Sequence, residues 1–265
     1  FKQQKKLRLT ATLHGHYEFL ATLRQQFQTQ TAYALQQIDA VVYTTQTHLQ
    51  TLAQYGYPQQ KTHKILYGIA IDNLPKLPIN QPKQPLQLIM ASRGIEEKGW
   101  WYAIEAVLAV NKQIPNSVQL TLLGEGAYLQ QLKQTYQQEK ALQFLPHTNN
   151  VIPILLSANI GLLPSYYIAE SLPNIVIEYL LCGKPVIASQ IGAIKEMLAA
   201  NGEEAGFCLP LSEGKPLVNE VKNAILQYLR QPALLQKHSE LAVVASQKFK
   251  MSFCVQQYCE LFNRL

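Results

Sequence analysis

Residues 168–189, IAESLPNIVIEYLLCGKPVIAS, combine two glutamates, Glu170 and Glu178, with a proline and an apolar run. The pattern predicts a loop, a helix, a stop at Gly-Lys-Pro and a strand. Pro173 suits the first turn of that helix, because the N–H group that proline lacks would be unpaired there. Glu170 then lies just before the helix and Glu178 inside it. Since backbone N–H groups at a helix N-terminus bind phosphate, the stretch predicts an anion site with a carboxylate on either side, as a sugar joined to a diphosphate would need.

The sequence after residue 86 alternates between strand-like and helix-like patterns, which is typical of a parallel sheet covered by helices. We expect strands at 87–92, 119–123, 142–145, 160–163, 186–189 and 206–209. Helices are expected at 100–113, 128–140, 150–157 and 215–229. A doubly wound sheet of this kind binds ligands at the carboxyl ends of its strands.

The sequence before residue 86 predicts a smaller α/β part. Its expected strands are 7–13, 40–45 and 64–68, and its expected helices are 17–38 and 47–55. Residues 73–85 contain four prolines and no hydrophobic periodicity, so we expect a linker there. The tail, residues 246–265, has the pattern of one or two helices.

The composition is that of a globular protein with ample core: 265 residues, of which 48% are hydrophobic and 15% charged. No apolar run approaches the ~20 residues that span a bilayer. The basic first residues are not followed by the apolar region of a signal peptide, so we expect a cytoplasmic protein. The four cysteines have no metal-binding spacing, which favours reduced thiols over disulfides or zinc. The chain does not begin with Met, and we expect it to be a fragment.

The net charge of +6 is concentrated in the first third of the chain. Residues 1–83 hold nine Lys/Arg against three Asp/Glu, whereas residues 84–265 hold fourteen of each. This excess could form a face for an anionic membrane or an acidic acceptor. The basic residues are scattered, however, which favours an ordinary solvated surface. No nucleic-acid-binding motif accompanies them.

Three loops of the sequence carry candidate ligand-binding residues. Arg93 and Lys98 lie in a glycine-flanked loop, RGIEEKG, where a guanidinium fork and an ammonium can converge on one diphosphate; a solvated loop is the alternative. Gly124 begins GEG after the next strand, which indicates either close approach of a ligand or a tight turn. His14 and His16 flank a glycine at a strand end, where side chains often meet ligands, although a lone histidine is usually structural.

Together these motifs resemble the retaining GT-B glycosyltransferases, in particular glycosyltransferase family 4 (glycosyl transferases group 1). ESLPNIVIEYLLCGKPVIAS is similar to the E-x7-E region of that family, and SRGIEEKG is similar to its R-x4-K loop. ILYGIAID, LLGEGAY, LLPSYYIAES and FKMSFCVQQYCELF resemble further family segments in the same order. The resemblance extends over nearly the whole chain from Thr12 onward.

The resemblance implies an α/β fold of GT-B type with three parts. These would be a remnant of the N-terminal, acceptor-side Rossmann-like domain (1–74), a near-complete C-terminal Rossmann-like domain with a parallel sheet (75–245), and a helix that crosses back to the first domain (246–265). Tyr67 stands where the family usually has Asn, and Ala70 is inserted in the Gly-Ile-Asp pattern. The early strands and the first glycine-rich loop of the N-terminal domain are missing, which implies loss of most of the acceptor site.

The resemblance also implies roles for single residues. Arg93 and Lys98 would hold the donor diphosphate and neutralise the leaving group, while Glu178 would bind the ribose hydroxyls. Glu170 would meet the hydroxyls of the donor sugar, and His14, a closer match than His16, would stand near the transferred sugar. The G-x-G turn and the helix start would supply the remaining nucleotide-sugar-binding residues: Gly124, Ser171, Leu172, Pro173 and Asn174. No metal or cofactor is expected, and the chain has no Asp-x-Asp to bind a metal.

These features imply an enzyme that transfers a sugar from a nucleotide-sugar, such as a UDP-sugar, to a glycan or lipid-linked acceptor with retention of configuration. Cell-envelope polysaccharide or lipopolysaccharide synthesis, at the inner face of the membrane, is the expected setting. Two alternatives stay open: a nucleotide-sugar epimerase of GT-B-like fold, and a non-catalytic nucleotide-sugar-binding module. A phosphorylase would need a lysine for pyridoxal phosphate, and the sequence offers no matching context.

Overall fold

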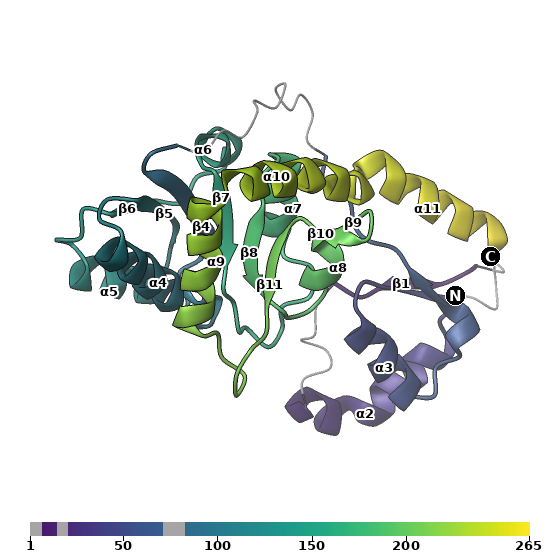
Figure 1. The fold of residues 1–265 in the computed structure, drawn as a ribbon. Coiled ribbons are helices and arrows are strands. Elements are labelled where there is room, and N and C mark those ends of the chain that lie inside the picture. Colours follow the sequence, from purple (N-terminus) through teal and green to yellow (C-terminus); the bar gives the residue numbers. More distant parts are fainter. Residues whose placement is uncertain (1–6, 15–20, 71–82) are drawn as a thin grey trace. The chain divides into compact units, whose positions relative to one another are not determined.

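The computed structural model describes residues 7–14, 21–70 and 83–265, with the main chain alone for 21–26 (Figure 1). These residues form two compact units. Unit 1 comprises those within Phe1–Ala70, Ile168–Leu172 and Lys248–Leu265, and unit 2 those within Ile71–Tyr167 and Pro173–Gln247. The short segment Ile168–Leu172 belongs to unit 1 and interrupts unit 2 in the sequence. The expected domains, with boundaries at 74 and 245, did not include this interruption. The expected linker, 73–85, lies outside the described residues except for 83–85.

Unit 2 is built on a parallel sheet of six strands. They are β4 (Leu86–Arg93), β5 (Val118–Glu125), β6 (Leu142–Leu145), β7 (Ile160–Leu163), β8 (Val186–Ser189) and β11 (Gly206–Leu209). Their spatial order is β6-β5-β4-β7-β8-β11, and every neighbouring pair is parallel. Numbered along the chain, this is the 3-2-1-4-5-6 order of a Rossmann sheet, whose direction of winding reverses between β4 and β7.

Helices cover both faces of this sheet, as the consecutive buried residues along β4, β7 and β8 require, because successive side chains of a strand point to opposite faces. The helices are α4 (Trp100–Gln113), α5 (Ala127–Thr135), α6 (Ile152–Ser157), α7 (Asn174–Leu181), α8 (Ile194–Leu198), α9 (Val218–Arg230) and α10 (Pro232–Ser246). The 3-10 turn η3 (Glu96–Lys98) precedes α4, and a small hairpin, β9 (Ala199–Ala200) and β10 (Glu203–Glu204), follows α8. Helices α4 and α9 lie side by side on one face (Figure 1).

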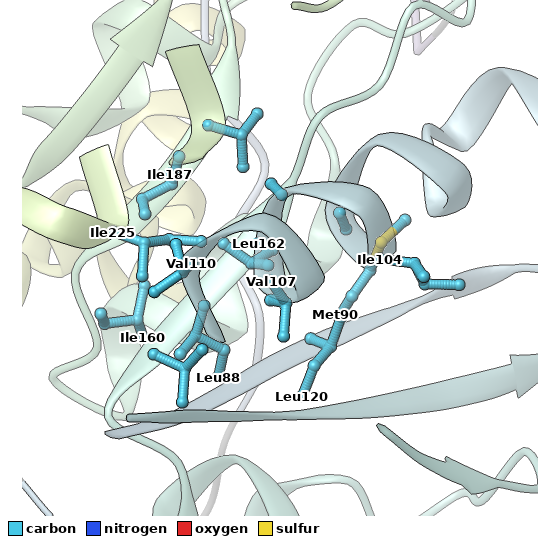
Figure 2. Packing of buried hydrophobic residues seen from close by; sticks show 14 of the residues in the cluster. Leu88, Met90, Ile104, Val107, Val110, Leu120, Ile160, Leu162, Ile187 and Ile225 are labelled. Atoms are coloured by element: carbon cyan, nitrogen blue, oxygen red, sulfur yellow. The ribbon is translucent and has the colours of Figure 1, made fainter. Parts of the chain in front are cut away.

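The core of unit 2 lies between the sheet and the α4–α9 layer. Figure 2 shows side chains of β4, β5, β7 and β8 meeting those of α4 and α9. In α4, the fully buried residues recur every three or four positions, which places them in one stripe facing the sheet. The labelled side chains from the strands are Leu88, Met90, Leu120, Ile160, Leu162 and Ile187, and those from the helices are Ile104, Val107, Val110 and Ile225.

Helix α7 is fixed on the opposite face by the fully buried Tyr179. Its hydroxyl accepts the Ala91 N–H (3.0 Å) and lies 3.3 Å from the Ile89 carbonyl and 3.4 Å from the Leu162 carbonyl, to either of which it can donate. A Cβ on Gly161 would lie 2.4 Å from the Tyr179 ring, so only glycine leaves room for this ring. Ala91 belongs to β4 and Leu162 to β7, so Tyr179 bridges the two strands at which the winding reverses.

Unit 1 has its own parallel sheet, β1 (Thr10–Thr12), β2 (Ala40–Tyr43) and β3 (Thr62–Lys64), in that order. Its helices are α2 (Ala21–Gln36), α3 (Gln46–Gln54) and α11 (Met251–Arg264), with 3-10 turns η2 (Gln59–Lys61) and η4 (Gln247–Phe249). Strand β2 is buried on both faces. Val41 joins Leu13, Leu35, Leu52 and Tyr57 in one cluster, and Ala40 and Val42 join Ile65, Cys254 and Leu261 in another.

Most expected elements are confirmed, and five have the bounds that we expected: the strands 142–145, 160–163, 186–189 and 206–209, and helix 100–113. The short strand with a turn that was expected at 64–68 is displaced: β3 spans Thr62–Lys64, and the Ile65 N–H still donates to the Tyr43 carbonyl of β2 (3.2 Å), but residues 66–68 are in no strand. The expected helix 128–140 ends at Thr135, and α8, α10 and the β9–β10 hairpin were not expected. Within the described part of the chain, no helix is long and apolar enough to cross a membrane, and the four cysteines are free thiols.

Candidate nucleotide-sugar site

The reversal of winding between β4 and β7 marks the place where a Rossmann sheet binds its ligand, beyond the carboxyl ends of those strands. Arg93 is the last residue of β4, and Pro164 follows the end of β7. The loop that begins at Arg93 contains both of the predicted diphosphate-binding cations, Arg93 and Lys98.

One aromatic ring, that of Tyr167, lies close to both cations. The Arg93 guanidinium carbon is 5.1 Å from the Tyr167 ring centroid, and the Lys98 ammonium is 4.8 Å from it. Cations are attracted to aromatic faces at such distances. The structure thus brings Arg93 and Lys98 together at a single side chain, as the interpretation of RGIEEKG as a diphosphate-binding loop requires.

Lys98 is held in place by the loop after β7. It lies in η3 and is only 6% exposed. The carbonyl of its neighbour Glu97 accepts hydrogen bonds from the Tyr166 N–H (2.8 Å) and the Ser165 hydroxyl (3.2 Å). The Ser165 oxygen also accepts the Tyr167 N–H (3.2 Å). The loops after β4 and β7 therefore form one hydrogen-bonded structure, and Tyr167 and Lys98 are both part of it.

Gly99 and Trp100 complete this junction. Gly99 has a φ of +83°, and a Cβ there would lie 1.8 Å from the Pro164 carbonyl oxygen, so the position requires glycine. The Trp100 indole N–H donates to the Arg93 carbonyl (2.9 Å), and its ring is fully buried. The start of α4 is in this way tied to the end of β4, which fixes the backbone on either side of Arg93.

Gly124 has a clear packing role. A Cβ on Gly124 would lie 2.1 Å from the Ser92 carbonyl oxygen, and the Gly94 N–H donates to the Glu125 carbonyl (2.6 Å). The close packing of the loops after β4 and β5 thus accounts for the GEG sequence. Gly124 also borders a hollow of about 310 Å³ beyond β5 and β6. Its role in nucleotide-sugar binding stays a prediction.

Helix α7 begins one residue later than expected. Pro173 has an extended conformation (φ −66°, ψ 120°) and precedes the helix as its N-cap residue, so Asn174 is the first helical residue and the placement of Pro173 in the first turn is wrong. The first N–H groups of a helix have no acceptor within the helix, which is the property that a phosphate would use. Glu178 lies in the helix as predicted and is half-buried, and burial raises the pKa of its carboxyl.

A second set of predicted residues lies in unit 1. The Ser171 hydroxyl donates to the His14 carbonyl (2.6 Å), and the Tyr67 hydroxyl donates to the Leu172 carbonyl. The His14 and Tyr67 rings are 5.8 Å apart between centroids. Glu170 is 7% exposed and lies in the same segment. The structure therefore brings His14 next to the segment that carries Glu170, while His16 lies outside the described residues.

The ten predicted site residues thus form two sets, one in each unit. Unit 2 holds Arg93, Lys98, Gly124, Pro173, Asn174 and Glu178, and unit 1 holds His14, Glu170, Ser171 and Leu172. The sequence did not point to Tyr167 as a site residue, and it pointed to Tyr67 only as a departure from the family pattern. An aromatic residue shortly after a strand end can indicate a ligand-binding residue. Which loops and cations it contacts, however, depends on which strands are neighbours.

Comparison with known proteins gives the same picture of the fold. The structure of Anabaena Alr3699/HepE in complex with UDP and glucose matches 100% of this chain and 73% of its own, with a TM-score of 0.75 and 20% identity. The pneumococcal O-GlcNAc transferase GtfA in complex with UDP and GlcNAc matches 97% of this chain and 52% of its own, with a TM-score of 0.72 and 18% identity. The predicted α/β fold with parallel sheets is confirmed.

Two curated relatives are similar in sequence. The amylovoran biosynthesis glycosyltransferase AmsK of Erwinia amylovora is 26% identical over 230 residues, which are 81% of this chain and 53% of AmsK. The exopolysaccharide phosphotransferase SCO2592 of Streptomyces coelicolor is 24% identical over 181 residues, which are 67% of this chain and 18% of SCO2592. The chain therefore spans about half the length of the first relative and much less of the second.

The family model described as glycosyl transferases group 1 matches residues 76–243. The matched region contains β4 to β11, the loops of Arg93, Lys98 and Tyr167, and helix α7 with Glu178. It covers more than half of the chain, and the chain belongs to the glycosyl transferases group 1 family.

Proposed function

We propose that unit 2 binds the diphosphate of a nucleotide-sugar, and that the protein carrying this chain transfers the sugar to a glycan or lipid-linked acceptor with retention of configuration. The observation that carries the proposal is the meeting of Arg93 and Lys98 at the Tyr167 ring, beyond the strands where the Rossmann sheet reverses. Two cations held near one another favour a dianionic group between them, and a diphosphate ester carries two charges.

The chemistry of sugar transfer gives these groups their roles. Cleavage of the sugar–phosphate bond builds negative charge on the diphosphate and positive character on the anomeric carbon. Cations and N–H groups that are fixed before the reaction stabilise that charge without reorganisation. Arg93, Lys98 and the start of α7 would act on the diphosphate. In this proposal no metal is required, because the two side chains supply the positive charge.

Three carboxyl or imidazole groups would act on the rest of the donor. Glu178 would accept hydrogen bonds from the ribose hydroxyls, and Glu170 would bind hydroxyls of the transferred sugar. His14, whose backbone carbonyl is bonded to Ser171, would stand near the same sugar. In this assignment Glu170 and Glu178 have separate partners and do not act as an acid–base pair.

The similar proteins suggest which donor and pathway to test first. HepE and GtfA were both solved with UDP and a sugar, so we propose a UDP-sugar as donor. AmsK is a glycosyltransferase of amylovoran biosynthesis, which supports polysaccharide assembly as the pathway. The name of SCO2592 gives a different transfer, that of a phosphate-linked group, but the match includes only 18% of that protein.

The diphosphate assignment can be tested by calorimetry with UDP. Lys98→Ala should weaken UDP binding by about 1.5–3 kcal/mol, the range for hydrogen bonds to charged groups. Lys112→Ala is the matched control, because Lys112 is exposed in the last turn of α4. Unchanged UDP affinity in a folded Lys98→Ala protein would rule out the diphosphate site.

Catalysis is tested separately by turnover. The protein is incubated with UDP-glucose, UDP-galactose or UDP-N-acetylglucosamine, with and without glycan acceptors, and products are followed by NMR at the anomeric carbon. A transferase releases UDP and forms a retained linkage, and Glu170→Ala abolishes both. UDP released without an acceptor, together with a free sugar whose configuration has changed at a ring carbon, would instead indicate an epimerase, and binding without any turnover would indicate a binding module.

A further inference from the structure

Tyr67 contacts the predicted sugar-binding residues, although no sequence motif indicates these contacts. Its hydroxyl donates to the Leu172 carbonyl, and its ring lies 5.8 Å from the His14 ring between centroids. Glu170, two residues before Leu172, is close enough to act on it electrostatically. One phenol thus contacts the segment of Glu170 on one side and His14 on the other.

The backbone that carries Tyr67 is itself fixed. A Cβ on the next residue, Gly68, would lie 2.6 Å from the Met251 Cα, so the chain passes against the start of α11 with no room for a side chain. The Ile69 N–H then donates to the carbonyl of the fully buried Phe249 (3.0 Å). Residues 67–69 are therefore held by the C-terminal segment of unit 1, and the phenol extends from a rigid support.

Two side-chain hydrogen bonds between described residues join the segment Ile168–Leu172 to the rest of unit 1. One joins the Tyr67 hydroxyl to the Leu172 carbonyl, and the other joins the Ser171 hydroxyl to the His14 carbonyl (2.6 Å). The two bonds lie directly after Glu170 in the sequence. They therefore fix the backbone from which the Glu170 carboxylate extends.

We propose that Tyr67 is a positioning residue for Glu170, which sets the carboxylate against the donor sugar by holding the Leu172 carbonyl. This inference rests on the proposed function, because it takes Glu170 to be the group that binds the sugar. It also gives a purpose to the departure from the family's usual Asn: the longer phenol reaches the Leu172 carbonyl while its ring lies next to His14.

The phenol is suited to this task over the whole working range of pH. Burial, and then the Glu170 carboxylate, raise the pKa of Tyr67 to about 12. The hydroxyl therefore keeps its proton and stays a donor. For the same reason Tyr67 is a poor general acid or base at neutral pH, so its contribution is geometric.

Tyr67→Phe removes the hydroxyl and keeps the ring, and Tyr57→Phe is its matched control. Tyr57 is also in unit 1, and its hydroxyl also donates to a backbone carbonyl, that of Ile38 (3.2 Å). Burial raises its pKa to about 12 as well. Both variants thus lose one part-buried phenol–carbonyl bond, but of these two residues only Tyr67 contacts the segment of Glu170.

Two measurements then test the proposal. Calorimetry compares UDP with the UDP-sugar, among UDP-glucose, UDP-galactose and UDP-N-acetylglucosamine, that most raises the melting temperature of the wild type. Tyr67→Phe should leave the UDP affinity unchanged and lower the UDP-sugar affinity by roughly three- to tenfold, the value of one hydrogen bond. Hydrogen exchange without ligand should be faster at residues 168–172 in Tyr67→Phe and unchanged there in Tyr57→Phe.

The outcomes separate this inference from the function on which it rests. If the wild type binds neither UDP nor any of the UDP-sugars, the proposed function falls and this inference falls with it. If the wild type binds but Tyr67→Phe behaves as Tyr57→Phe in both measurements, Tyr67 is an ordinary structural residue and only this inference is overturned. Equal losses of UDP and UDP-sugar affinity in Tyr67→Phe would also overturn it, because the effect would not then concern the sugar.

Discussion

The Tyr167 ring lies next to both predicted diphosphate-binding cations, Arg93 and Lys98. Its effect on UDP binding can be tested. Lys and Arg side chains each lose about 2 kcal/mol of rotamer entropy when they are fixed, and part of this is already lost at the Tyr167 ring before a ligand arrives. Tyr167→Leu should therefore weaken UDP binding by about 0.5–2 kcal/mol, the range of cation–π contacts. Tyr167→Phe should retain the wild-type affinity, because it keeps the ring.

Calorimetry with UDP checks this, and Tyr166→Leu is the neighbouring control. The Tyr166 hydroxyl is bonded to the Glu96 carboxylate (3.2 Å) and is not one of the contacts of Arg93 or Lys98 described above. If Tyr167→Phe binds UDP as weakly as Tyr167→Leu does, the hydroxyl and not the ring is the important group, and the cation–π explanation is wrong.

Glu178 should make donor binding sensitive to acid. Burial raises the pKa of its carboxyl above the ordinary value of 4.5, so the group takes up a proton at a higher pH than an exposed glutamate does. The protonated form has lost acceptor capacity toward the ribose hydroxyls. UDP-sugar affinity should therefore fall as the pH is lowered from 7.5 toward 5, and this fall should be smaller in Glu178→Gln.

The measurement is calorimetry with the best UDP-sugar at both pH values. A UDP-sugar is the right probe because its diphosphate is a diester and keeps its charge in this range, unlike that of UDP. A Glu178→Gln protein with the same pH dependence as the wild type would mean that another group is responsible.

At the scale of elements, the position of α7 depends on one hydroxyl. Tyr179→Phe would leave the buried Ala91 N–H without the hydroxyl that it now donates to at 3.0 Å. A buried donor that loses its partner costs about 1–3 kcal/mol. Urea unfolding should show a loss of this size, whereas Tyr33→Phe, at a residue that is 67% exposed on α2, should change the free energy of unfolding little. A neutral Tyr179→Phe would show that α7 is held by apolar packing alone.

The elements also show what could be predicted from the sequence. Strands 142–145, 160–163 and 186–189 are short, mostly apolar runs that each adjoin a proline, so one end of each was visible in the sequence. Helix α10 was missed because it follows α9 after the single residue Gln231. Residues 66–68 do not continue the strand expected at 64–68, because the Tyr67 hydroxyl bonds to the Leu172 carbonyl and Gly68 packs against the Met251 backbone. Both partners are far away in the sequence.

The same reasoning applies to the site. The residue types in RGIEEKG and in residues 168–189 were enough to propose Arg93, Lys98 and the two glutamates as candidates, because each motif is local. The contact of both cations with Tyr167 depends on β7 lying next to β4, and strand order is not encoded in any short stretch. Long-range pairing, not local pattern, decides which side chains share a site.

At the scale of the whole molecule, the chain has separate cores in its two units. Leu52 belongs to a cluster of unit 1, and Ile104 to the cluster of unit 2, and both are fully buried. The family match, residues 76–243, falls largely within unit 2. Each unit should therefore be stabilised mainly by its own core, and UDP should bind to residues of unit 2.

Two truncations test this independence by hydrogen exchange. Each of Leu52→Ala and Ile104→Ala removes a fully buried aliphatic side chain and should cost about 2–5 kcal/mol where the cavity forms. Because protection reports local as well as global opening, Leu52→Ala should speed exchange in β1 to β3 and spare β4 and β5, and Ile104→Ala should do the reverse. UDP should slow exchange in β4 and β5 of the Leu52→Ala protein as it does in the wild type. If either truncation speeds exchange equally in both sheets, the units unfold as one, and the separation of their cores has no thermodynamic meaning.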